Sequence, residues 1–233
     1  MSYLYDLWDD FMSLLFPRLC HGCGNHLMRN EALICTECFV KIPRSGYHLK
    51  PDNPVEKLFW GRCLISKAAA FSFYTRDSRI RRLIHQLKYK GAKEIGPELG
   101  RIYARSLKSS GFLDDIDIII PVPLHPSKKR QRGFNQSDLI SQGISEVSGI
   151  PVDTSLLFRK TITRTQTRKS RYDRWTNVHD IFRVRDEEKL IGRHILLVDD
   201  VITTGSTIEA CANELLKAED TRVSVLALAF SII

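Results

Sequence analysis

The feature that most constrains the fold is a set of three continuous, mainly apolar runs in the second half of the chain. These runs are Ile118–Ile120, Ile195–Val198 and Val223–Phe230. A strand that is apolar at successive positions is buried on both faces, which is typical of a parallel sheet covered by helices. Apolar residues at helical spacing predict helices over 95–107, 139–147 and 208–215, and 68–74 predicts a further strand. The alternation of strands and helices predicts an α/β fold with a mostly parallel sheet.

Four of the six cysteines form two C-x2-C pairs, Cys20/Cys23 and Cys35/Cys38, with eleven residues between the pairs. Each pair presents two thiolates from one tight turn, and two pairs complete the tetrahedral shell of a structural zinc site. Redox cysteines, iron in place of zinc, or His21 and His26 as substitute ligands are the alternatives. A redox C-x-x-C normally occurs once, so the duplication favours a structural metal. Cys63 and Cys211 stand apart from this pattern and are predicted to be small core residues.

Composition excludes several classes of protein. Lys and Arg outnumber Asp and Glu by 35 to 27, and the resulting charge of +8 favours phosphates or other polyanions as partners. Residues 1–16 have the spacing of an amphipathic helix but no basic cluster, so they do not resemble a secretion signal. No apolar run approaches the ~20 residues of a membrane span. The sequence predicts a soluble, cytoplasmic protein.

The segment with the most chemical information follows the second apolar run. Asp199 and Asp200 come at the end of that run, and Thr203–Thr207 form a small hydroxyl-rich turn before a helix that begins near Ser206. Backbone amides at such a turn bind anions, and paired carboxylates accept hydrogen bonds from sugar hydroxyls. The alternative is a simple helix cap, at Thr204 or Ser206, beside solvated carboxylates. Because a cap does not explain two adjacent acids, the pattern favours a sugar-phosphate ligand.

The 195–207 segment resembles the phosphoribosyl-pyrophosphate (PRPP) signature of type I phosphoribosyltransferases, and nearly the whole chain resembles the ComF family of competence-associated proteins. The segments that carry the resemblance are Phe16–Cys20 with the cysteine pairs, Gln86–Lys90, Pro121–His125, Arg130–Gln136, Arg164–Gln166 and the signature itself. The resemblance implies a type I phosphoribosyltransferase fold with a small N-terminal zinc module. It divides the chain into 1–45, the N-terminal helix and zinc module; 46–66, a connector; and 67–233, the phosphoribosyltransferase-like domain.

The same resemblance implies roles for individual residues. Asp199 and Asp200 would be the catalytic residues and bind the ribose hydroxyls. Residues expected around PRPP are Val201, Thr203, Thr204, Gly205, Ser206 and Thr207 at the 5-phosphate, and Val122, Pro123, Leu124 and His125 in the pyrophosphate loop. Arg132, Arg164, Gln166 and Arg171 are candidates for a lid that contacts pyrophosphate. Mg²⁺ would accompany PRPP.

The resemblance implies a role in DNA uptake during natural transformation, with a competence helicase as a partner that docks on the zinc module. Two classes of function fit. In the first, the protein transfers a phosphoribosyl group and releases pyrophosphate, although no base-binding hood defines the acceptor. In the second, it is an inactive module that keeps the PRPP site and handles single-stranded DNA or senses PRPP.

The basic clusters at 76–93 and 159–174 exceed what one small ligand needs. A second polyanion such as single-stranded DNA would use them, with Phe134, Tyr172 and Trp175 as stacking platforms. A solvated basic face is the alternative.

Overall fold

The computed structural model describes residues 16–160 and 181–231 of the chain. Its main sheet has four strands in the order β1-β6-β5-β2, and every pairing between them is parallel. The strands are β1 (Ala68–Phe73), β2 (Ile118–Pro121), β5 (His194–Ile202) and β6 (Arg222–Phe230). All four strands lie where the sequence predicts them, so the predicted α/β fold with a parallel sheet is confirmed.

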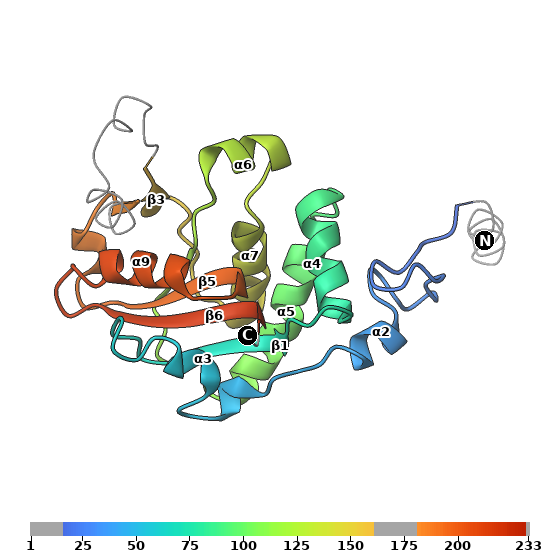
Figure 1. Cartoon of the computed structure of the whole chain (residues 1–233), viewed down its shortest axis with the longest axis horizontal. Helices are drawn as coiled ribbons and strands as arrows, with labels where there is room; N and C mark the ends of the chain where they lie inside the picture. Colours follow the sequence, from blue (N-terminus) through green and yellow to red (C-terminus); the bar gives the residue numbers. More distant parts are fainter. Residues whose placement is uncertain (1–15, 161–180, 232–233) are drawn as a thin grey trace.

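Helices cover both faces of this sheet (Figure 1). The longer helices are α4 (Arg79–Tyr89), α5 (Ile95–Ser109), α7 (Gln136–Ser148) and α9 (Ser206–Leu215). Shorter elements are α2 (Thr36–Val40), η1 (Tyr47–Leu49), α3 (Pro54–Lys57), α6 (Pro126–Arg132) and η3 (Glu188–Leu190). A separate antiparallel ribbon pairs β3 (Leu157–Arg159) with β4 (Phe182–Val184).

The continuous apolar runs are explained by burial on both faces of the sheet. In β5, Leu196 and Val198 belong to one apolar cluster with residues of α4, α5 and α7. Ile195 and Leu197 belong to a second cluster with residues of α3 and α9. Successive side chains of a strand point to opposite faces, so a strand between two helical layers is apolar at every position. Cys211 is fully buried in the second cluster, as predicted for a core residue.

Helices α5 and α7 pack with their backbones in contact at glycines. A Cβ atom added at Gly143 would lie 2.1 Å from the carbonyl oxygen of Pro97, and one added at Gly100 would lie 2.3 Å from that of Ile140. No side chain fits at such distances, so the two glycines set the spacing of the helices.

Residues 46–66, predicted to be a connector, contain η1 and α3 and contribute to the core of the sheet domain. Val55 and Phe59 are fully buried against the β-sheet. Asn53 caps α3 with a reciprocal bond to Glu56, and its amide nitrogen also donates to the carbonyl oxygen of Ala68 at 2.8 Å. The sequence lacked periodicity here because these elements are too short to show it.

The four-cysteine segment lies beside α4, at one end of the molecule (Figure 1). An isolated bridge between Leu19 and His26 closes its first turn, and α2 begins directly after Cys35 and contains Cys38. The predicted N-terminal helix falls outside the described residues. None of the helices in the described ranges is long and apolar enough to cross a membrane.

Candidate functional site

The adjacent carboxylates of Asp199 and Asp200 lie near the carboxyl end of β5, on a strand that continues to Ile202. The Asp199 carboxylate accepts hydrogen bonds at Oδ1 from the hydroxyl of Ser137, at 3.1 Å, and from the backbone amide of Asp200, at 2.8 Å. The ammonium of Lys88, from the last turn of α4, lies 2.8 Å from Asp200 Oδ1. Asp200 is only 4% exposed, so the alternative of solvated carboxylates is wrong for this residue.

One oxygen of this pair lacks a partner. Asp200 Oδ2 is buried, and none of the described residues donates a hydrogen bond to it. A buried carboxylate oxygen without a donor costs free energy, and a bound hydroxyl or a cation would remove that cost. This oxygen is therefore available to a ligand.

The electrostatics of the pair are unusual. Burial, and next the charge of Asp200, raise the pKa of Asp199 to about 7. The pKa of Asp199 is lowered by hydrogen bonds from the Asp200 amide and Ser137 and by the charge of Lys88, but these effects do not cancel the increase. Ionisation of Asp199 is therefore costly unless a ligand supplies donors or positive charge.

The loop after β5, at Thr203–Gly205, leads directly into α9. Gly205 has a φ of 74° and occupies the N-cap position of α9 without any side-chain cap, so the alternative of a cap at Thr204 or Ser206 is wrong. Among the described residues, no acceptor is bonded to the backbone amides of Thr203, Thr204 or Gly205. Free amides at the start of a helix are a favourable site for a phosphate.

Segment 46–66, which the sequence predicts to be a connector, supports this loop. Arg62 donates to the carbonyl oxygen of Thr204 at 2.9 Å and forms an ion pair with Glu209 in the first turn of α9. Leu58 and Phe59 lie so close to Gly205 that a Cβ atom there would be 2.8 Å from one and 3.0 Å from the other. Gly205 is therefore required both by its left-handed conformation and by this contact.

The predicted pyrophosphate loop lies next to the acidic pair because β2 pairs with β5. The amide of Val122 donates to the carbonyl oxygen of Val198 at 2.8 Å, directly before Asp199. The side chain of Asn135, which caps α7, donates to the carbonyl oxygen of Val122 at 3.0 Å. His125 uses its ring nitrogen to cap α6 and contacts Ser127 there.

Of the four lid and pyrophosphate candidates, Arg132 is the one within the described ranges. Its guanidinium bonds to the side chain of Gln136 and lies over the ring of Tyr89, with 5.5 Å to the ring centroid. Arg164, Gln166 and Arg171 lie outside the described residues. Tyr172 and Trp175, predicted as stacking platforms, also fall outside them, whereas Phe134 is 8% exposed and lines a small cleft with Lys88 and Arg132.

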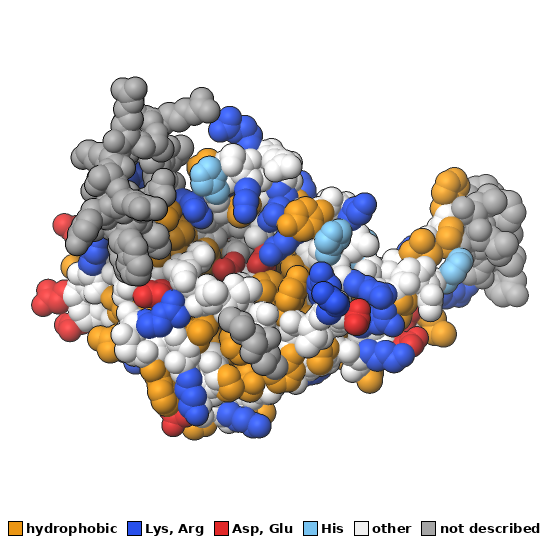
Figure 2. Space-filling view, in the orientation of Figure 1, with side chains coloured by type: hydrophobic (Ala, Val, Ile, Leu, Met, Phe, Trp, Pro, Cys, Tyr) orange, Lys and Arg blue, Asp and Glu red, His pale blue; other side chains and the backbone are white. Residues whose placement is uncertain are grey.

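Positive charge surrounds the acidic pair. A cavity of about 590 Å³ beside the β2 loop is lined by Lys129, Arg130, Arg159 and Arg185. A second of about 350 Å³, between α4 and α6, is lined by Lys88, Lys128 and Arg132. Figure 2 shows this face hollowed, with acidic groups at its floor and Lys and Arg around it. Such a field attracts an anionic ligand.

The four sulfurs of Cys20, Cys23, Cys35 and Cys38 come together in the module that lies beside α4. All of them lie within 4.8 Å of one another, and the sulfurs of Cys23 and Cys35 are 3.7 Å apart. Metal–sulfur bonds of ~2.3 Å in a tetrahedral shell require sulfurs ~3.8 Å apart. The cluster therefore has the composition and spacing of a metal site.

Backbone amides of the module favour the thiolate of one of these cysteines, Cys20, whereas burial raises the pKa values of Cys35 and Cys38. Amides of Gly22 and Cys35 donate to the sulfur of Cys20 at 3.3 and 3.2 Å. Burial raises the pKa of Cys20, but these amide bonds outweigh burial and lower it to about 7. A Cβ atom at Gly22 would lie 2.9 Å from the sulfur of Cys38, so only glycine leaves room for the cluster. Zinc and iron both fit these four donors, and His21 and His26 are not part of the cluster.

Comparison with known proteins gives the family. Residues 130–231 match a family model described as the phosphoribosyl transferase domain. The chain is 33% identical over 216 residues to the DNA utilization protein YhgH of Salmonella typhimurium, an alignment that covers 88% of this chain and 93% of that protein. The chain belongs to the ComF/YhgH family. It is also 31% identical over 224 residues to competence protein F of Haemophilus influenzae, covering 91% of this chain and 96% of that protein.

Solved structures give weaker likenesses than these relatives. A Bacillus subtilis glutamine PRPP amidotransferase complexed with ADP and GMP is 23% identical with a TM-score of 0.41, over 57% of this chain and 26% of that one. The fold assignment of this ComF/YhgH chain therefore depends on its strand order and the family model.

The sequence does not predict three contributors to the site as site residues. Lys88 belongs there to the basic cluster at 76–93, Ser137 is not singled out, and Arg62 lies in the predicted connector. Their partners lie 112, 62 and 142 positions away. Lys88 lies in the segment 86–90 of the ComF resemblance, and Ser137 directly follows the segment 130–136, so these segments could have indicated both residues. Nothing in the sequence indicated Arg62.

Proposed function

We propose that this ComF/YhgH protein binds PRPP at the acidic pair and the loop after β5. The observation that carries the proposal is the buried Asp200 oxygen without a donor, next to a phosphate cradle of free amides. A ribose diol supplies hydroxyl donors to Asp199 and Asp200, while Thr203–Thr207 bind the 5-phosphate through backbone amides and hydroxyls. The match of residues 130–231 to the phosphoribosyl transferase domain supports this assignment.

We infer that catalysis, where it occurs, displaces pyrophosphate from the anomeric carbon of PRPP. The bond from that carbon to the pyrophosphate oxygen breaks and its electrons leave with pyrophosphate, while a nucleophile of the acceptor bonds to the carbon. The residues of the chain orient the ribose, and Val122–His125 with nearby cations stabilise the leaving group. Mg²⁺, when bound, supplies further positive charge to pyrophosphate, and the two carboxylates are suitable oxygen ligands for it.

The names of the relatives favour a role in DNA utilization or competence, and we propose that role for this chain. The basic surroundings of the site suit single-stranded DNA as a partner in that process, and the four-cysteine module, with zinc as its metal, is the proposed docking surface for a competence helicase. A PRPP-sensing module without turnover is the second candidate, because the sequence has no recognisable base-binding hood that would define an acceptor. In that case PRPP changes DNA affinity and no pyrophosphate is released.

Calorimetric titration of PRPP with Mg²⁺ tests the first proposal. Saturable binding is expected for the wild type and for Asp77→Asn, an exposed control, and is expected to be lost in Asp199→Asn/Asp200→Asn. The double variant should remain folded, because asparagine keeps the acceptor that Ser137 uses. Equal binding by the double variant, or no binding by the folded wild type, would refute the assignment. An acceptor screen for pyrophosphate release then separates transferase from sensor.

A further inference from the structure

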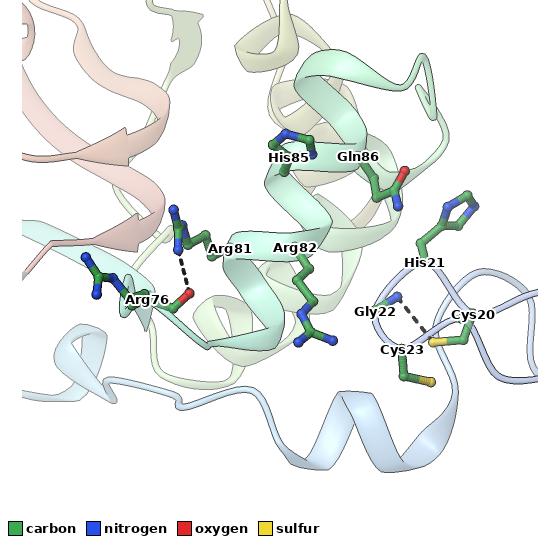
Figure 3. Close-up of a pocket in the computed structure, with 10 residues that line it drawn as sticks. Cys20, His21, Gly22, Cys23, Arg76, Arg81, Arg82, His85 and Gln86 are labelled. Atoms are coloured by element: carbon green, nitrogen blue, oxygen red, sulfur yellow. Dashed lines mark hydrogen bonds between the residues drawn. The ribbon is translucent and has the colours of Figure 1, made fainter.

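A pocket of about 350 Å³ lies between the end of α4 and α6. Arg82, near the start of α4, extends toward the four-cysteine module (Figure 3), whereas Lys88 and Tyr89 at the end of the helix line this pocket instead. The ammonium of Lys88 also lies 2.8 Å from Asp200 Oδ1. One side chain therefore joins the pocket to the carboxylate that is proposed to hold the ribose.

The lining of the pocket combines aromatic rings with positive charge. Two aromatic side chains, Tyr89 and Phe134, and three cations, Lys88, Lys128 and Arg132, line it, and no acidic residue does. The guanidinium of Arg132 lies over the ring of Tyr89, 5.5 Å from its centroid. A ligand that matches such a lining has a flat ring, for contact with the aromatic side chains, and an anionic group for the cations. The volume is within the range of small-ligand sites.

Helix α6 separates this pocket from the cavity beside the β2 loop, and it lies between β3 and α4 in Figure 1. Lys128 and Arg132 of α6 line the pocket at α4. Lys129 and Arg130 line the cavity of about 590 Å³ at β3. Residues 123–124 of the predicted pyrophosphate loop line that cavity and not the pocket at α4. We therefore expect pyrophosphate on the β3 side of α6.

A phosphoribosyl transfer needs a second ligand on the other side of the ribose. A nucleophile that displaces a leaving group in line approaches the anomeric carbon from the face opposite to that group. The pocket at α4 lies on the opposite side of α6 from the β3 cavity and reaches the acidic pair through Lys88. This position suits the acceptor, for which the sequence defines no binding hood.

We propose that the pocket between α4 and α6 is the acceptor site and that its substrate is a planar aromatic or heteroaromatic acid. The ring lies against Tyr89 and Phe134, and the anionic group lies at Lys128 and Arg132. This inference rests on the proposed PRPP site, which supplies the sugar. In the transfer, the nucleophile of the acceptor bonds to the anomeric carbon while the bond to pyrophosphate breaks with its electron pair, and the proton of the nucleophile passes to water.

The test uses the full, metal-loaded chain. Orotate and anthranilate are the aromatic acids, and uracil and aniline are the same rings without the carboxylate. Binding of each probe is measured by equilibrium dialysis with and without PRPP and Mg²⁺, and pyrophosphate release is followed in the same samples. The pocket variant is Lys128→Gln/Arg132→Gln, and the matched variant, Lys129→Gln/Arg130→Gln, removes the same charge from the other side of α6. Thermal unfolding checks that both variants remain folded.

We expect at least one of the two acids to bind at least about tenfold more tightly than its uncharged ring. The pocket variant should raise the Kd of that acid by about tenfold or more, with less than about a twofold change in the matched variant. Tyr89→Leu, at an exposed position, should raise it by about threefold through loss of the ring contact. The affinity for PRPP should fall more in the matched variant than in the pocket variant.

Absence of binding by both acids, or equal affinity for the acids and the uncharged rings, would overturn the proposal and leave the PRPP site intact. A larger loss of PRPP affinity in the pocket variant than in the matched variant would also overturn it, because the pocket would then hold pyrophosphate. Failure of the proposed function is seen separately, as absence of PRPP binding by the folded wild type, and it would remove the acceptor role as well.

Discussion

At the scale of single residues, the chemistry of the site comes from two carboxylates in different environments. Asp200 has a cation, Lys88, on one oxygen and no donor on the other. Asp199 is held by the hydroxyl of Ser137 and by the main chain, and its pKa is raised to about 7. This arrangement lowers the stability of the free protein and favours a ligand with several hydroxyls. Such an arrangement is typical of a binding site.

The raised pKa of Asp199 makes stability depend on pH. Between the ordinary carboxyl range near pH 4 and about pH 7, the folded chain keeps a proton that the unfolded chain releases, so the free energy of unfolding falls as pH rises through this window. Asp199→Asn removes the titrating group. We expect this variant to be more stable than the wild type at about pH 8 by on the order of 2 kcal/mol, with the difference shrinking toward pH 4.

Urea unfolding at several pH values measures this difference, with Asp77→Asn as the exposed control. A wild type and an Asp199→Asn variant with parallel pH profiles would contradict the raised pKa.

At the scale of elements, the proposed phosphate-binding loop after β5 is held by a segment that is distant in sequence. Arg62 binds the carbonyl oxygen of Thr204 and the carboxylate of Glu209, and so ties the loop to the first turn of α9. The β2 loop is held in a similar way by Asn135 at the start of α7. Both loops are therefore positioned by neighbouring elements as well as by the strands that precede them.

Arg62→Met is expected to weaken PRPP binding by about tenfold, because the loop loses its anchor while its amides remain. Its effect on the free energy of unfolding should be about 1–2 kcal/mol. Calorimetry with PRPP and Mg²⁺, at temperatures well below unfolding, measures the affinity. Lys57→Met, an exposed change on the same segment, is the control, and equal affinities of the two variants would show that Arg62 does not position the loop.

Gly143→Ala tests the contact between α5 and α7. The added methyl group meets the Pro97 carbonyl, so the helices must separate at a cost of about 2–3 kcal/mol. Urea unfolding measures this cost, and Gln142→Ala, exposed on the same helix, should stay within about 0.5 kcal/mol of the wild type. A Gly143→Ala variant as stable as that control would mean that the two helices are not packed this closely.

At the scale of the whole molecule, a large apolar core and a metal cluster stabilise two parts of the chain differently. The sheet domain has two extensive apolar clusters, whereas the module has a small one built on its own cysteines. A segment with so little apolar surface depends on its metal for folding.

Removal of the metal, by a chelator or by Cys35→Ser/Cys38→Ser, is expected to unfold residues 16–41 and leave the sheet domain and its PRPP binding intact, because residues 42–45 pack on β1 and bond to it. Hydrogen exchange resolved by segment measures both outcomes, and Cys63→Ser is the control outside the cluster. Loss of protection throughout β5 and β6 would instead mean that the two parts fold as one unit.

Most of the fold was predictable because its signals are local. Burial on both faces produced the apolar runs of β2, β5 and β6, and helical spacing located α5, α7 and α9. The strand β5 extends beyond the predicted run because Val201 and Ile202 still pair with β6. The four cysteines were predictable as a cluster because metal ligands occur in pairs at short spacing.

The sequence by itself determined the α/β class, the four-cysteine cluster and the presence of adjacent acids before a hydroxyl-rich turn. Each of these features depends on residues that are neighbours along the chain. Only the tertiary structure decided that Lys88 meets Asp200, that Arg62 anchors the loop at Thr204, and that Arg82 of α4 extends toward the cysteine module (Figure 3). These contacts join residues that are far apart in sequence, and they depend on how the helices pack against the sheet. Packing of that kind leaves no periodic or local pattern in a single sequence.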